Sequence, residues 1–115
     1  MKLKKIGLEY KNKKFEITVK ECNWFKKISG LTFTRREKAK ALLFDFKKPV
    51  QWNFHSLFVF FPFIAIWLDG NDKIISIKNI KPFKYNLSPK KPFEKVIEIP
   101  INSRYNKIIK LLVDD

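Results

Sequence analysis

Hydrophobic residues alternate with polar ones over residues 6–10 and again over residues 15–19. Alternation with a period of two places one row of side chains in a core and the other in water, as in a half-buried β-strand. The polar residues 11–13 between the two segments suit a turn. The pattern therefore predicts an N-terminal β-hairpin.

Further segments are rich in the β-branched and aromatic residues that favour sheets. They cover residues 41–46, 52–61, 63–68, 73–80 and 94–99. Lys47-Lys48-Pro49 is expected to end the first of them, and Pro62, which lacks an amide donor, separates the next two. Asp69-Gly70-Asn71-Asp72 is typical of a tight turn, so residues 68–80 are predicted to form a second hairpin.

Two short helices are also expected. Asn23 can cap the first, and Asn102 or Ser103 can cap the second, in which apolar residues recur at a helical spacing from Tyr105 to Leu112. No alternating βαβ units are present, so the sheet should be mainly antiparallel. The predicted fold is mainly β (α+β), a small barrel-like or sandwich-like sheet with one or two short helices. Residues 1–115 are expected to form a single domain.

The charge of the chain is strongly positive. Lys and Arg total 25 against 11 Asp and Glu, a net charge of +14, and the excess lies in residues 1–40 and 73–115 around a nearly neutral middle. Such a surface can bind nucleic acid. However, 22 of the 25 basic residues are Lys, whereas recognition of phosphates and bases favours the planar Arg fork. A solvated Lys-rich surface is therefore the competing interpretation.

Single Cys and His residues exclude several kinds of site. Cys22 alone cannot form an intramolecular disulfide or a Cys-only zinc site, and His55 alone cannot form a multi-His metal centre. No metal or cofactor is expected. The N-terminus lacks the apolar stretch of a signal peptide, and the strongly apolar part of residues 49–68 is too short to span a bilayer. We therefore expect a cytoplasmic protein with no membrane span.

Arg35, Arg36, Trp52, His55 and Asp69 are the candidate ligand-binding residues. Guanidinium groups pair with carboxylates or phosphates, and aromatic rings stack on bases or sugars. His55 would act as a general base only if a carboxylate such as Asp45 or Asp69 oriented it. The alternative is that His55 is a structural residue. No catalytic residue is assigned.

The motifs together resemble a known family. They are Gly30-Leu31 followed by Arg35, the Leu43-Phe44 strand, His55 followed by Pro62, Asp69 at a turn, and Pro82. In this order and spacing they resemble the domain of unknown function 192 family, small uncharacterised prokaryotic proteins, in its archaeal form. The resemblance covers about residues 15–101 and implies a fold but no established activity.

Three departures from the family pattern bear on any family site. Thr32 stands where the family has Met, and Ile64 stands where it has Asp. The C-terminal Gly-Asp element has no counterpart in residues 101–115. The polar group best suited to chemistry is thus missing at position 64.

These observations favour a non-catalytic module that binds an unidentified ligand or protein partner. One alternative is a nucleic-acid-binding module that uses the Lys-rich surface. A further alternative is a hydrolase or transferase that depends on His55. A homodimer is also an open interpretation, since apolar surface on residues 58–67 would favour one.

Overall fold

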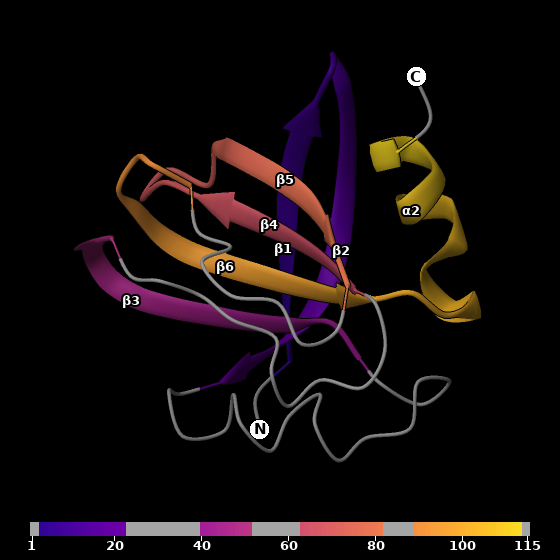
Figure 1. Cartoon of the computed structure of the whole chain (residues 1–115). Helices are drawn as coiled ribbons and strands as arrows, with labels where there is room; N and C mark the ends of the chain where they lie inside the picture. Colours follow the sequence, from indigo (N-terminus) through magenta and orange to yellow (C-terminus); the bar gives the residue numbers. More distant parts are fainter. Residues whose placement is uncertain (1–2, 23–39, 52–62, 82–88, 114–115) are drawn as a thin grey trace.

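The N-terminal hairpin predicted from the alternation is present. The computed structural model describes residues 3–22, 40–51, 63–81 and 89–113. In it, strand β1 (Leu3–Tyr10) pairs antiparallel with β2 (Lys13–Cys22) (Figure 1). Lys11 and Asn12 form the turn with φ of 51° and 65°, the left-handed values that a two-residue hairpin turn requires.

The second predicted hairpin is also present. Strand β4 (Phe63–Leu68) pairs antiparallel with β5 (Ile74–Ile80), which begins one residue later than the predicted segment. The turn closes through the amide of Asp69, which donates to the carbonyl of Lys73 at 3.0 Å. Asp72 has a φ of 61°, as expected for the residue that follows a type I turn in such a loop.

Strand β3 (Leu42–Val50) extends beyond its predicted end. We expected Lys47-Lys48-Pro49 to stop it at Phe46, and this prediction is wrong. Lys47 has a φ of 61°, and the pairing of β3 with β6 (Phe93–Pro100) shifts between Asp45 and Val50. The basic stretch is therefore an irregularity within the strand, after which Val50 pairs again with Phe93.

The C-terminal segment folds as its sequence indicates. The side chain of Asn102 accepts a hydrogen bond from the amide of Arg104 and caps the 3-10 turn η1 (Ser103–Tyr105). Helix α2 (Asn106–Val113) follows and packs Ile108, Ile109 and Leu112 against the sheet. The predicted cap and apolar face are confirmed, although Tyr105 lies in η1 rather than in the α-helix.

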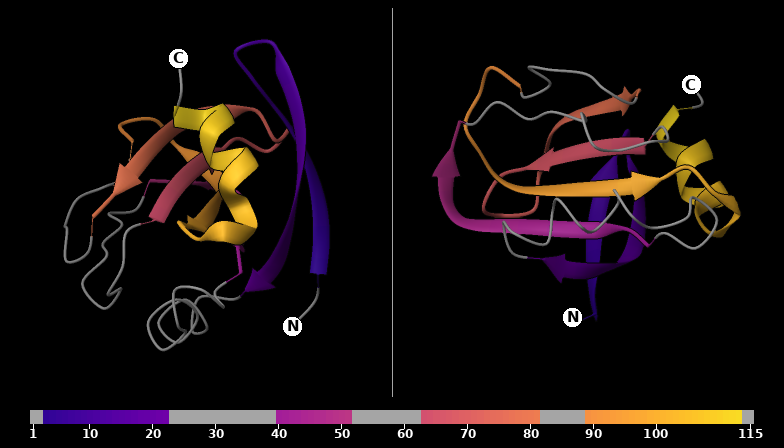
Figure 2. Two further views of the ribbon diagram at one scale, coloured as in Figure 1. Left: turned by 90° about the vertical axis from the view of Figure 1, so that its right-hand side faces the viewer. Right: turned by 60° about the horizontal axis from the view of Figure 1, so that its bottom comes forward.

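The strands form a single sheet in the order β1-β2-β3-β6-β4-β5. All neighbours pair antiparallel except β2 and β3, which are parallel. The β1–β2 hairpin crosses the other four strands steeply, and α2 lies beside that hairpin, next to the C-terminal end of β6 (Figure 2). This is a curled half-barrel, so the predicted barrel-like and mainly antiparallel fold is confirmed. The predicted helix after Asn23 and the strand at 52–61 lie outside the described residues.

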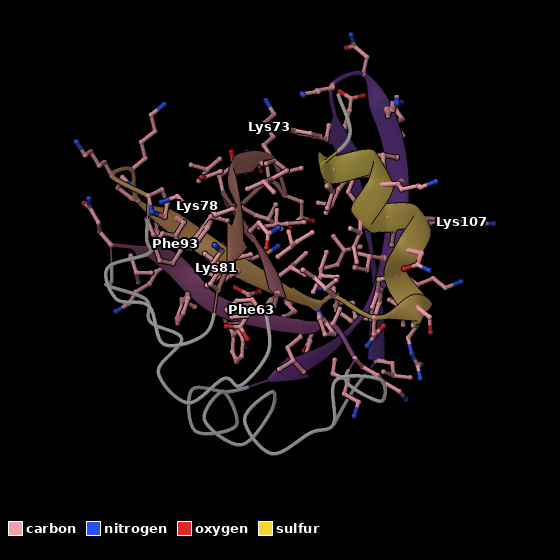
Figure 3. The ribbon with its side chains drawn as sticks, turned by 45° about the vertical axis from the view of Figure 1, so that its right-hand side comes forward. Phe63, Lys73, Lys78, Lys81, Phe93 and Lys107 are labelled. Carbon is pink, nitrogen blue, oxygen red and sulfur yellow. The ribbon has the colours of Figure 1, made fainter. Side chains whose placement is uncertain are left out.

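Both faces of the sheet are buried at its centre. In β4 the even-numbered residues Ile64, Ile66 and Leu68 join a core that also holds α2. Its odd-numbered residues Phe63, Ala65 and Trp67 join a second core on the opposite face. Phe93 of β6 belongs to the same core, and Phe63 and Phe93 are labelled in Figure 3. Because every residue of β4 is buried, the sequence of this strand is a continuous apolar run and does not alternate between apolar and polar residues.

Candidate functional site

One of the five predicted ligand-binding residues lies in the described part of the chain. Arg35, Arg36, Trp52 and His55 lie outside the described residues, and Asp69 lies in the turn between β4 and β5. The oxygen Oδ1 of Asp69 accepts the backbone amides of Asn71 at 2.8 Å and Lys73 at 3.0 Å. Among the described residues, the Asp69 carboxylate therefore stabilises the turn between β4 and β5.

The hydrogen bonds within the turn change the acidity of Asp69. The backbone amide of Lys73, and then that of Asn71, hold the pKa of this carboxyl below its usual value of 3.8, because both bonds favour the charged form. The next carboxylate, Asp72, binds the Nζ of Lys95 on β6 at 2.6 Å. That bond raises the pKa of Lys95 above 10.5 and ties the turn to the middle of the sheet.

We expect Asp69 to make stability depend on pH in the acid range. Its pKa is lowered in the folded chain, so its contribution is complete above about pH 5 and is lost as the pH falls below 3.8. The amide of an Asp69→Asn variant does not titrate. Urea unfolding at pH 5 and pH 3 should therefore show a smaller acid loss for the variant than for the natural chain. Equal losses in both proteins would show that the ionisation of Asp69 does not contribute to the stability of the fold.

A groove separates the two hairpins. It has a volume of about 1130 Å³ and is lined by residues 7–11 of the β1 hairpin, by residues 14–16 of β2 and by residues 71–77 of the second hairpin. Strands β1 and β5 end the sheet order, and their Cα atoms approach within 8 Å without pairing. This volume lies slightly above the roughly 300–1,000 Å³ of typical small-molecule pockets.

Consecutive residues of β1 and β5 border this groove. Side chains of successive strand residues point to opposite faces, so an unbroken run of lining residues means that the groove follows the strand edge. In a two-residue hairpin the pair beside the turn exchanges both hydrogen bonds, and such pairs recur at every second residue. Since Tyr10 pairs with Lys13, the backbone groups of Gly7 and Glu9 are directed away from β2, toward the groove.

The groove combines balanced charge with apolar surface. Among the described residues of its lining, three are basic (Lys11, Lys14 and Lys73) and three are acidic (Glu9, Glu16 and Asp72). Tyr10, Phe15 and Ile77 add half-buried apolar surface. Lys73 lies in the turn of the β4–β5 hairpin, directly before β5 (Figure 3). A nearly neutral occupant with apolar side chains therefore suits the groove better than a polyanion does.

The sequence did not point to this groove. The residues that line it were expected to occupy ordinary strand and turn positions. That β1 and β5 are edge strands follows only from the order of the strands in the sheet. Ile64, at the position where the family pattern carries Asp, is fully buried in the apolar core. In the described part of the chain, no three His, Cys, Asp or Glu side chains gather to hold a metal ion. None of its helices is long and apolar enough to cross a membrane.

These features define a small, mostly β domain with a half-barrel sheet and an open groove between its edge strands. The chain belongs to the domain of unknown function 192 family, whose model, described as "Uncharacterized ACR, COG1430", matches residues 7–110. The family resemblance is thus confirmed, over a longer segment than residues 15–101. A search of curated proteins finds no match.

Two crystal structures share the fold. One is a "putative transcription regulator" from Sinorhizobium meliloti 1021, with a TM-score of 0.73 and 15% identity over 92% of this chain and 84% of that chain. The other is a protein of unknown function from Novosphingobium aromaticivorans DSM 12444. It has a TM-score of 0.71 and 15% identity over 92% of this chain and 78% of that chain. At this identity the likeness concerns the fold alone.

Proposed function

We propose that this chain is a non-catalytic binding domain that takes an extended segment of a partner protein into the groove between its two hairpins. The observation that carries the proposal is the unbroken run of edge-strand residues along the groove, residues 7–10 of β1 and 74–77 of β5. An extended peptide has backbone donors and acceptors at the spacing of a strand edge and can add to a sheet as a further strand.

The chemistry of the groove supports a peptide with apolar residues at alternate positions. Such a peptide would use the backbone groups of Gly7 and Glu9 for hydrogen bonds and the side chains of Tyr10 and Phe15 for apolar contact. An ideal Cβ at Gly7 meets no atom within 4 Å, so the solvent-facing side of β1 is open there. The equal numbers of basic and acidic residues disfavour a strongly charged ligand.

The name of one related structure supports a binding role. The Sinorhizobium protein is named a "putative transcription regulator". From that name we infer only that this chain has a binding role. The archaeal form of the family, the cytoplasmic location and the role of His55 in a hydrolase or transferase stay predictions.

A Glu9→Pro variant tests the proposal. Proline removes the amide of residue 9, which is directed away from β2, and edge strands tolerate proline at such positions. Peptides selected from a random dodecapeptide display library should bind the variant about fivefold more weakly, since one hydrogen bond contributes about 1 kcal/mol. Fluorescence anisotropy with a labelled selected peptide measures the change.

Two matched variants serve as controls. Lys5→Pro removes an amide with the same orientation that lies outside the groove, and Glu9→Gln keeps the amide while removing the charge. Both should bind the peptide as the natural chain does. Equal weakening by Lys5→Pro, or failure to select any peptide, would contradict the proposal. A homodimer that dissociates in Glu9→Pro would assign the groove to a second copy instead.

A further inference from the structure

A second, smaller groove lies where β2, the start of β3, η1 and α2 meet. It has a volume of about 410 Å³. Three basic side chains line it, those of Lys20, Lys40 and Arg104, together with the hydroxyl-bearing Thr18. Among the described residues that line it, Glu16 is the one carboxylate. The lining thus has a surplus of positive charge, unlike the balanced groove between the hairpins.

Hydrogen bonds hold the elements that bear these three cations together. The amide of Lys20 donates to the carbonyl of Ala41 at 2.9 Å, which fixes Lys40, the preceding residue, beside β2. The amide of Ala41 donates to the hydroxyl of Tyr105 at 2.6 Å, and this bond is buried. Arg104 precedes Tyr105, so its backbone is anchored to the same point. The groove is therefore built on a preorganised backbone rather than on free loops.

The groove offers more than charge. Leu3 pairs with Lys20 across the hairpin and is 57% exposed, an unusual position for a large apolar residue in the described part of the chain. Ile108 of α2 adds a half-buried apolar surface. Cationic groups next to apolar surface suit a ligand that joins a phosphate to a less polar sugar or base.

We propose that this groove binds neighbouring phosphate groups of a single-stranded nucleic acid, one at each of its three cations. The Arg104 guanidinium and the two lysines would donate to phosphate oxygens, and Leu3 would contact the adjoining sugar or base. Lys107 lies three residues after Arg104, about one helical turn, and points away from the sheet (Figure 3). It continues the basic surface beyond the groove, as a polyanion requires. The net charge of +14 favours the approach of such a strand.

The test measures the salt dependence of binding to a fluorescein-labelled 12-nucleotide oligouridylate. Each phosphate contact contributes about 0.7 to the slope of log K against log salt for single strands. The Lys20→Ala/Lys40→Ala/Arg104→Ala variant should therefore reduce the slope by about 2. Arg104→Ala alone should reduce it by about 0.7. Because Arg104 is exposed, the single variant keeps the test valid if the triple variant does not fold.

A variant with the same loss of charge elsewhere is the matched control. Lys48, Lys90 and Lys91 are exposed and lie near the start of β6, whereas Arg104 follows its end, about 25 Å away along an eight-residue strand. Their triple replacement by alanine should leave the slope nearly unchanged. An equal reduction would show that binding depends on net charge alone and would overturn the proposal.

Two other outcomes would also overturn it. One is the absence of oligouridylate binding by the natural chain at low salt. The other is uridine monophosphate binding as tightly as the oligonucleotide, which would make the groove a site for a free phosphate compound. Weak binding of the mononucleotide together with the loss in slope would support recognition of a strand.

Discussion

Replacing Trp67 by alanine should lower the free energy of unfolding by about 3–5 kcal/mol, the cost of truncating a large buried aromatic side chain. Trp67 is completely buried in the central strand β4, which pairs with both β5 and β6. The Nζ of Lys78 lies 5.6 Å from its ring centroid, so a cation–π contact is lost as well. Because small domains are stable by only about 5–15 kcal/mol, this loss is a large part of the total free energy of unfolding.

Urea denaturation followed by circular dichroism measures this effect. Leu3→Ala is the matched control, since it also removes a large apolar side chain but from an exposed position. It should change stability by no more than about 0.5 kcal/mol. A loss of less than about 1 kcal/mol in Trp67→Ala would mean that the core on this face is not closely packed.

Tyr105→Phe should destabilise the chain by about 1–3 kcal/mol, because it leaves a buried amide without its acceptor. The hydroxyl of Tyr105 accepts the amide of Ala41 at 2.6 Å, across 64 residues of sequence. The aromatic ring remains in the variant, so the apolar packing changes little. The effect therefore reports the hydrogen bond that fastens η1 to the start of β3.

Hydrogen exchange of the Ala41 amide gives an independent readout. The amide should exchange faster in Tyr105→Phe than in the natural chain, beyond the increase that the lower global stability causes. Tyr10→Phe, at a half-buried position on the first hairpin, should leave both stability and Ala41 exchange nearly unchanged. Unchanged Ala41 exchange in Tyr105→Phe would contradict the assigned role.

Local patterns predicted much of the secondary structure. The alternation over residues 6–19 and the tight-turn signature at Asp69 each gave a correct hairpin, because turn residues and a period of two act over a few neighbouring positions. The same local reasoning failed at Lys47-Lys48-Pro49. There, pairing with β6 resumes beyond the irregularity at Val50, and this long-range contact outweighs the local propensity to stop.

The candidate sites were less predictable. Asp69 was chosen as a ligand-binding residue because it matched a family motif, yet in the described residues its carboxylate binds backbone amides of its own turn. Lys20, Lys40 and Arg104 were three among 25 basic residues, and nothing in their spacing set them apart. They line one groove because Ala41 bonds to both β2 and Tyr105.

Four properties follow from the amino-acid sequence alone: the class of fold, the two hairpins, the C-terminal helix with its cap, and the strongly positive charge. These properties depend on side-chain periodicity, on turn residues and on composition, all of which are local. Other properties arise only in the folded sheet: β2 and β3 run parallel, β6 inserts between β3 and β4, and β1 and β5 are left as edges. Strand pairing uses backbone groups that nearly every residue carries alike. The order of the strands, and with it the place of both grooves, therefore depends on the packing of the whole sheet.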